Sequence, residues 1–366
     1  MSEERLTEAH AANGKGDPLL RVRDLRVHFP VRRSFLGPRA VVRAVDGVDL
    51  DIASGATLGL VGESGCGKST LARAVLRLVP EASGEIVFHG TDVLQARGRA
   101  LHRLRRDMQM VFQDPASSLN PRLTIGRSVG EPLEVQRVAR GAALRARVAE
   151  LLELVGLHPD DASRYPHEFS GGQRQRIVIA RAIALRPRLV VCDEPVSALD
   201  VSVGAQVLNL LADLKRDLGL TYLFVAHNLA VVRYLSDAVA VMYLGKIVEQ
   251  APTADLFEKP RHPYTMLLLD SVLEPGIRRD RAREQDVVRA EPPSPLAPPT
   301  GCAFHPRCPF AVDKCRSVAP MLESVGGGIG DPGVHSVACH RADEIPSRIA
   351  LWRTISLSLP PLPRGH

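Results

Sequence analysis

A glycine-rich turn between a short apolar run and a helical pattern constrains this chain more than any other feature. The apolar run Thr57–Val61 leads into Gly62-Glu63-Ser64-Gly65-Cys66-Gly67-Lys68-Ser69-Thr70, and helical periodicity then continues to about Leu78. Strand, loop and helix in this order satisfy the P-loop pattern, whose glycines let backbone N–H groups curl around a phosphate at a helix N-terminus. The residues expected to bind ATP or GTP here are Gly62, Ser64, Gly65, Cys66, Gly67, Lys68, Ser69 and Thr70.

Charged and hydroxyl side chains at two places supply the chemistry that a bound triphosphate needs. Lys68 is expected to neutralise the β- and γ-phosphates, and Ser69 to place its hydroxyl on Mg²⁺. Further along, the apolar residues 189–192 run directly into Asp193 and Glu194, which is the Walker B arrangement. We expect Asp193 to hold the magnesium shell and Glu194 to polarise the attacking water.

The remaining apolar patterns indicate the fold class. Alternation over residues 20–29 and 41–50 predicts an antiparallel pair of strands with a loop near residues 30–40. Residues 189–192 and 220–226 are short apolar runs typical of buried parallel strands, while residues 101–186 look mainly helical. A hairpin is expected around the turn Gly245-Lys246. The class is therefore α/β.

Composition excludes several classes of protein. With 366 residues, 45% of them hydrophobic and 24% charged, the chain has the make-up of a folded protein of about two domains. Its apolar runs stay well short of the ~20 residues that cross a bilayer, and its first 17 residues are polar, so we expect neither a membrane span nor secretion. The formal net charge of +6 comes from scattered arginines, which does not favour nucleic-acid binding.

Between the two phosphate motifs, Phe169-Ser170-Gly171-Gly172-Gln173 resembles the signature motif of ABC-type ATPases. Other motifs of that family match in order: Gln113 resembles the Q-loop glutamine, Ser197-Ala198-Leu199-Asp200 the D-loop, and His227 the switch histidine. The resemblance implies an ABC-type P-loop NTPase with an antiparallel β subdomain and a helical subdomain.

The resemblance also implies a role for each matched residue. Ser170 and Gly172, together with Gly171 and Gln173, would face the γ-phosphate held by an opposing subunit, so hydrolysis would need two subunits. Gln113 would reach Mg²⁺ and the attacking water, and His227 would contact the γ-phosphate and orient Glu194. Asp200, in the segment that resembles the D-loop, would also belong to the nucleotide-binding residues. Phe29 is placed like the family's adenine-stacking aromatic, although a strand phenylalanine is a core residue about as often.

A narrower resemblance extends from about Leu20 to His340. The segment Lys259-Pro260-Arg261-His262-Pro263-Tyr264-Thr265 looks like the mark of oligopeptide and dipeptide importer ATPases. Cys66 in the P-loop and Ser118-Leu119-Asn120-Pro121-Arg122 look more like the F-type ATPase of such importers than its D-type partner.

The narrower resemblance implies a set of partners. They are a second ABC ATPase that forms a heterodimer with this chain, two transmembrane permeases and an extracytoplasmic peptide-binding protein. The chain itself would lie peripherally on the cytoplasmic face of the cell membrane and hydrolyse ATP to drive uptake of di- or oligopeptides.

Two alternatives stay open at this point. The same motor could serve nickel, sugar or drug transport, because solute choice belongs to other chains. An ABC ATPase acting on nucleic acid would carry a long arm between P-loop and signature, and the segment from Gln113 to Ser170 is too short for one. We therefore expect no nucleic-acid partner.

The organisation along the chain follows from these motifs and from composition. We expect a disordered start over residues 1–18, the ABC ATPase domain over 19–250 with its helical subdomain at about 114–186, and a C-terminal extension over 251–290. A proline-rich linker over 291–300 precedes a cysteine module over 301–345 and a tail over 346–366. We expect the module to fold apart from the nucleotide-binding core.

Four of the six cysteines cluster beyond the linker, at Cys302, Cys308, Cys315 and Cys339. A protein that uses cytosolic ATP sits in a reducing compartment, which disfavours disulfides. The spacing lacks the close pairs of most zinc sites, although His305, His335 and His340 could serve as reserve ligands. Four thiolates are compatible with a 4Fe-4S cluster, which the resemblance also favours, so we expect that cluster, with zinc or free thiols as alternatives.

Overall fold

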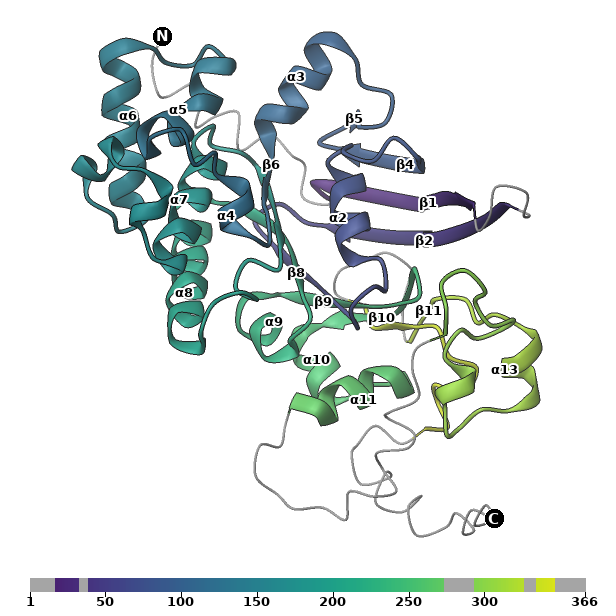
Figure 1. Cartoon of the computed structure of the whole chain (residues 1–366). Helices are drawn as coiled ribbons and strands as arrows, with labels where there is room; N and C mark the ends of the chain where they lie inside the picture. The colour runs from purple at the N-terminus through teal and green to yellow at the C-terminus, as the bar shows by residue number, and fades with distance from the viewer. Residues whose placement is uncertain (1–16, 33–38, 273–292, 326–333, 346–366) are drawn as a thin grey trace.

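The computed structural model describes residues 17–32, 39–272, 293–325 and 334–345 of the chain. Residues 1–16 of the expected disordered start, residues 33–38 of the expected loop, residues 273–290 of the expected C-terminal extension and the tail over 346–366 lie outside these ranges. Two sheets organise the described part, and helices pack beside them (Figure 1).

The first sheet has four antiparallel strands in the order β2-β1-β4-β5. Its strands are β1 (Leu20–Arg32), β2 (Arg39–Ile52), β4 (Ala82–Phe88) and β5 (Thr91–Asp92). The predicted pair is confirmed as β1 and β2, with Phe29 opposite Val42. Alternate apolar residues of these strands pack onto the second sheet and the helix after the P-loop, forming one of two hydrophobic clusters.

The second sheet has the order β11-β12-β10-β9-β3-β8-β7-β6. Its strands are β3 (Thr57–Val61), β6 (Met108–Val111), β7 (Leu189–Asp193), β8 (Thr221–Ala226), β9 (Ala238–Tyr243), β10 (Lys246–Pro252), β11 (Glu323–Ser324) and β12 (Ser336–Val337). The five strands from β9 to β6 are parallel and the other three antiparallel, so the predicted parallel strands and the β9–β10 hairpin are confirmed. The mainly helical stretch differs from expectation in containing β6, which is too short to show a period.

Helices pack beside both sheets. They are α2 (Lys68–Val75), α3 (Gly98–Asp107), α4 (Pro115–Ser118), α5 (Ile125–Val135), α6 (Gly141–Leu154), α7 (Gly171–Ile183), α8 (Val201–Leu218), α9 (Leu229–Leu235), α10 (Thr253–Glu258), α11 (Pro263–Val272) and α13 (Asp313–Ser317), with 3-10 turns η1 (Pro159–Ser163), η2 (Pro166–Glu168) and η3 (His305–Arg307). Helices α4 to α7 gather on one side, away from the antiparallel sheet (Figure 1).

The cysteine-bearing segment does not stand apart from the core as expected. Strand β12 pairs antiparallel with β10, so the segment extends the main sheet. Phe304 is 1% exposed and belongs to the same hydrophobic cluster as the central strands. The sequence concealed this, because a two-residue strand leaves no periodic pattern and the contacts join residues far apart in the chain.

Candidate active site

The P-loop is seated against two strands that leave no room for side chains at its glycines. Gly67 has φ +110°, and a Cβ there would lie 1.9 Å from the carbonyl oxygen of Ala44 on β2. At Gly62, a Cβ would lie 2.2 Å from the carbonyl oxygen of Met242 on β9. Backbone atoms cannot move aside as side chains do, so glycine is required at both positions. These two close approaches therefore fix the path of the loop beside β2 and β9.

Lys68 lies inside this curve at the start of α2. Its ammonium donates hydrogen bonds to the carbonyl oxygens of Gly62 at 2.8 Å and Glu63 at 3.0 Å, and the residue is only 4% exposed. A buried ammonium with backbone partners on one side is a fixed positive charge beside the helix N-terminus. Both features favour a polyanion such as a triphosphate.

The first Walker B carboxylate has the features of a magnesium-binding group. Asp193 is 1% exposed at the end of β7, and its Oδ1 accepts a 2.8 Å hydrogen bond from the hydroxyl of Ser69. Its Oδ2 has no hydrogen-bond partner among the described residues, and the nearest cation is Arg73 at 3.8 Å. Burial raises the pKa of Asp193. An underpaired buried carboxylate beside a serine hydroxyl matches the oxygen ligands that Mg²⁺ prefers.

The second carboxylate, Glu194, meets two polar side chains from neighbouring strand ends. Its Oε2 accepts a 3.0 Å hydrogen bond from the amide of Gln113 and lies 3.3 Å from Nδ1 of His227. The three residues follow β7, β6 and β8, whose carboxyl ends meet at one edge of the parallel sheet. The structure thus brings together three residues that the sequence predicted as catalytic. Ser197 of the D-loop also lies 3.4 Å from the Gln113 amide.

A cavity of about 250 Å³ opens between the P-loop and this carboxylate. Its lining includes Gln113, Glu194 and P-loop residues from Ser64 to Thr70. Phe29 is half-buried against the antiparallel-sheet cluster and does not line the cavity, whereas its strand partner Val42 does. Pro295 of the proline-rich linker lines the cavity as well, a contribution that the sequence did not indicate.

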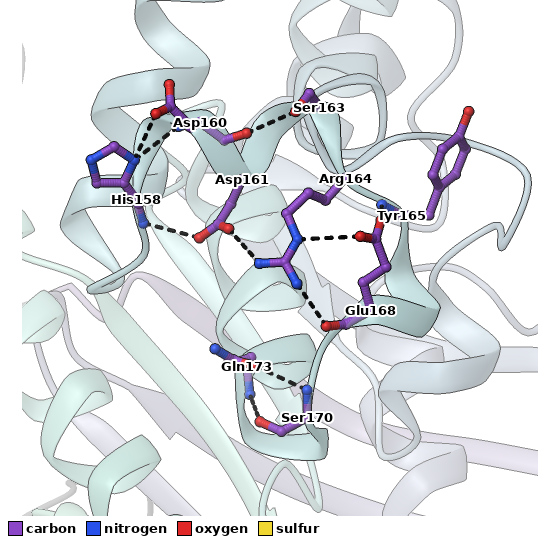
Figure 2. A network of polar contacts seen from close by, with 9 residues as sticks. All are labelled: His158, Asp160, Asp161, Ser163, Arg164, Tyr165, Glu168, Ser170 and Gln173. Carbon is purple, nitrogen blue, oxygen red and sulfur yellow. Dashed lines mark hydrogen bonds and ion pairs between the residues drawn. The ribbon is translucent and has the colours of Figure 1, made fainter.

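The signature residues lie outside the cavity lining, at the exposed start of α7. Ser170 caps the helix: its hydroxyl accepts from the N–H of Gln173 at 3.3 Å, and the Gln173 amide oxygen accepts from the N–H of Ser170 at 3.0 Å (Figure 2). Gly171 is exposed, whereas Gly172 is buried, where a Cβ would meet Val203 of α8 at 2.3 Å. The signature is therefore fixed in shape and directed outward.

Asp200 of the D-loop caps the neighbouring helix α8. Its carboxylate accepts hydrogen bonds from the N–H of Val203 and the hydroxyl of Ser202, both at 2.9 Å. These bonds lower the pKa of Asp200, the Val203 bond most of all. Asp200 is exposed beside the signature, so both motifs lie on a surface that another molecule can reach.

A polar network that the sequence analysis missed supports the turn before the signature. Arg164 donates to Asp161 at 2.8 Å and to the backbone carbonyl of Glu168 at 2.9 Å, and the Glu168 carboxylate accepts from the N–H of Tyr165 (Figure 2). The Tyr165 bond is the main reason that the pKa of Glu168 is lowered. The one pattern in the sequence that indicates this network is the i, i+3 and i+4 spacing of its charged residues.

Cys302, Cys308, Cys315 and Cys339 line one small cavity of about 10 Å³, together with His305 and His340. His335 is not in the lining and contacts Glu249 instead. Burial raises the pKa of the Cys308 thiol to about 12 and that of Cys339 to about 11. Across the described ranges, no three His, Cys, Asp or Glu side chains are arranged as a metal site. The four sulfurs share a location, but the cavity as it stands is too small for a cluster.

The two-sheet fold, the P-loop, and Asp193 and Glu194 at the end of β7 together define a class: a P-loop ATPase of the ABC type. A family model described as ABC transporter matches residues 45–197, and one described as the C-terminal region of oligopeptide/dipeptide transporters matches residues 248–315. The chain belongs to the oligopeptide/dipeptide branch of the ABC transporter ATPases.

Individual relatives agree with this assignment. The chain is 49% identical over 346 residues to "Probable peptide ABC transporter ATP-binding protein y4tS" of Sinorhizobium fredii, covering 94% of this chain and 96% of that one. It is 48% identical over 327 residues to the oligopeptide transport ATP-binding protein AppF of Bacillus subtilis, covering 88% and 97%. A solved dimeric ATP-binding cassette with bound ADP and phosphate superposes with a TM-score of 0.57 at 28% identity, covering 64% of this chain and 98% of that one.

Among the helices in the described ranges, none is both long and apolar enough to cross a membrane.

Proposed function

We propose that this chain is the ATP-hydrolysing subunit of an importer that takes up di- or oligopeptides through separate permease subunits. The observation that carries this is the contact of Gln113 and His227 with Glu194, beside a P-loop cavity that Gln113 and Glu194 line, in a chain whose C-terminal region matches peptide transporters. Similarity to the peptide-transport relatives over nearly the whole chain supports the substrate class. Nothing favours nickel, sugar, drug or nucleic-acid alternatives.

The site residues divide the work of hydrolysis. Lys68 and the loop N–H groups bind the phosphates, and Asp193 with Ser69 would hold Mg²⁺, which offsets the charge of the triphosphate. Glu194 accepts the proton of the water that attacks the γ-phosphorus, and the bond to ADP breaks as the bond to the water oxygen forms. Gln113 and His227 keep the carboxylate oriented and add hydrogen bonds to the water and the γ-phosphate.

A second ABC ATPase completes each site in this proposal. The capped, exposed signature at Ser170 lies outside the lining of the chain's own cavity, which supports a role toward a nucleotide held by another subunit. The solved dimeric cassette supports the same arrangement. We assign this chain to the F-type member of a heterodimer, docked peripherally on two permeases at the cytoplasmic face and supplied by an extracytoplasmic peptide-binding protein.

We also propose a metal for Cys302, Cys308, Cys315 and Cys339, a 4Fe-4S cluster with zinc as the alternative. Support comes from the donor set, because four cysteines around one cavity are the ligands that both groups take. The small cavity and the absence of a metal-site arrangement in the described ranges weigh against it, so the cavity would have to open. The hydrolysis steps above do not depend on this group.

Reconstitution tests the proposed function. The chain, its partner ATPase and the two permeases are assembled in vesicles with the binding protein, and uptake of a labelled tripeptide is followed together with ATP consumption. Peptide should stimulate ATPase activity, and Glu194→Gln should abolish both signals while ATP still binds. Stimulation by Ni²⁺ or a sugar but not by peptides would overturn the substrate class.

A further inference from the structure

Glu63, the second residue of the P-loop, is held by three parts of the chain. Its N–H donates to the hydroxyl of Tyr264 on α11 at 2.8 Å, and its carbonyl accepts from Lys68. Its carboxylate accepts two parallel hydrogen bonds from the guanidinium of Arg307, at 2.9 and 3.0 Å. Both Tyr264 and Arg307 lie in the C-terminal region, outside the motifs that the sequence marked as the nucleotide site.

The pair of Arg307 and Glu63 has the geometry of a strong interaction. The Arg307 side chain is only 3% exposed, and its guanidinium carbon lies 5.7 Å from the ring centre of Phe304 and 6.0 Å from that of Tyr243. A bidentate pair shielded from water in this way is stronger and more directional than a surface ion pair. The Glu63 side chain is 28% exposed, so removing Arg307 would leave a partly buried carboxylate without its partner charge.

The start of α11, which carries Tyr264, is itself fixed to the main sheet. Glu249 on β10 is fully buried, and its carboxylate accepts from the N–H groups of Arg261 and His262 and lies 2.7 Å from Nε2 of His335. The His262 ring in turn accepts from the N–H of Tyr264 at 3.1 Å. The support behind the P-loop is therefore continuous from the sheet to Glu63.

We propose that Arg307 and Tyr264 are positioning residues that hold the P-loop in its phosphate-binding form, so that the C-terminal region sets nucleotide affinity within the same chain. This deepens the proposed function and rests on its P-loop assignment. Arg307 has a second effect, because it neutralises a carboxylate next to Ser64, which lines the cavity where the triphosphate would bind. Without Arg307, the Glu63 carboxylate would repel the phosphates.

Equilibrium binding of Mg-ATP to the full chain tests the proposal. Arg307→Met should raise the Kd about tenfold, because it leaves the Glu63 carboxylate unpaired. Adding Glu63→Gln removes that carboxylate, so the double variant should bind ATP more tightly than Arg307→Met alone. Arg316→Met, an exposed arginine in the same segment, is the matched control and should bind like the wild type.

Hydrogen exchange separates positioning from a general loss of stability. Exchange at residues 62–67 should speed up in Arg307→Met and in Tyr264→Phe, while exchange in β7 and β8 stays as in the wild type. Arg307→Lys keeps the charge but not the bidentate geometry, and it should show an intermediate Kd even if Arg307→Met does not fold.

The proposal is overturned if folded Arg307→Met or Arg307→Lys binds Mg-ATP like the wild type, or if Glu63→Gln weakens Arg307→Met further. These outcomes concern ATP binding by the chain alone. Failure of peptide uptake in the reconstituted importer would contradict the proposed function and leave this result unaffected.

Discussion

Gly172→Ala is a sharp test of how the signature is held. The added Cβ would lie 2.3 Å from Cγ1 of Val203, whereas ordinary contact begins at 3.4 Å, so α7 or α8 must move by about 1 Å. Val203 is β-branched on a helix and has essentially one side-chain rotamer, so its methyl group cannot swing away. Overpacking of this kind costs about 1–3 kcal/mol. The helix propensity of alanine offsets at most about 1 kcal/mol, so from the middle of that range, about 2 kcal/mol, a net loss of about 1–2 kcal/mol should remain.

Gly171→Ala is the matched control, because its Cβ would meet only Leu199 Cδ2 at 3.4 Å. Urea unfolding should place it near the wild type and Gly172→Ala below both. Adding Val203→Ala to Gly172→Ala removes the clashing methyl group and should recover most of the loss. In the assembled transporter, a 1 Å displacement of the signature should lower the ATPase rate by one to two orders of magnitude. Stability of Gly172→Ala equal to that of Gly171→Ala, or no recovery with Val203→Ala, would refute the packing argument.

Four further expectations concern catalysis, assembly, metal and pH. Glu194→Gln should lower kcat by about 10²–10⁴ with ATP affinity retained, whereas Lys68→Ala should lose ATP binding, as filter binding and steady-state rates will show. The dilute chain alone should hydrolyse ATP far more slowly per subunit than the assembled transporter, and equal rates would contradict a shared site. Anaerobically purified protein should contain about four irons per chain, fewer in Cys308→Ser, while one zinc would decide for the alternative. Burial lowers the pKa of His262 to about 4, so as the pH falls from 6.5 to 4 the unfolded chain takes up a proton at His262 before the folded chain does. The free energy of unfolding should therefore fall over this pH range. His262→Asn should flatten that slope, whereas the same substitution at the exposed His102 should not.

Site residues that belong to a short local motif could be predicted, whereas residues whose role depends on contacts with distant parts of the chain could not. The P-loop, Asp193 and Glu194 each follow an apolar strand directly, so strand, turn and helix could be recognised within a short window. Gln113 and His227 were found only through the family resemblance, yet parallel strands that end at one edge explain why they meet Glu194. Arg307 and Glu63 are 244 positions apart, and no periodicity or spacing connects them.

The same reasoning explains where the predicted organisation fell short. Strand β12 has two residues, too few for alternation, so the cysteine segment read as a separate module although it extends the main sheet. The adenine contact of Phe29 stays a prediction: its side chain is half-buried against the antiparallel-sheet cluster and is not in the cavity lining. Its neighbour across the sheet, Val42, reaches the cavity instead.

The two family models divide the chain in a way that the contacts help to explain. The first, over residues 45–197, contains the P-loop and both Walker B carboxylates, whereas the second covers residues 248–315. The second range holds Glu249, Tyr264 and Arg307, which form the support behind Glu63. A C-terminal region built only to meet other subunits would not need a bidentate ion pair with the P-loop of its own chain. Its contacts therefore favour a role in shaping the nucleotide site. Any change that displaces this region should raise the Kd for ATP before it affects other properties of the chain.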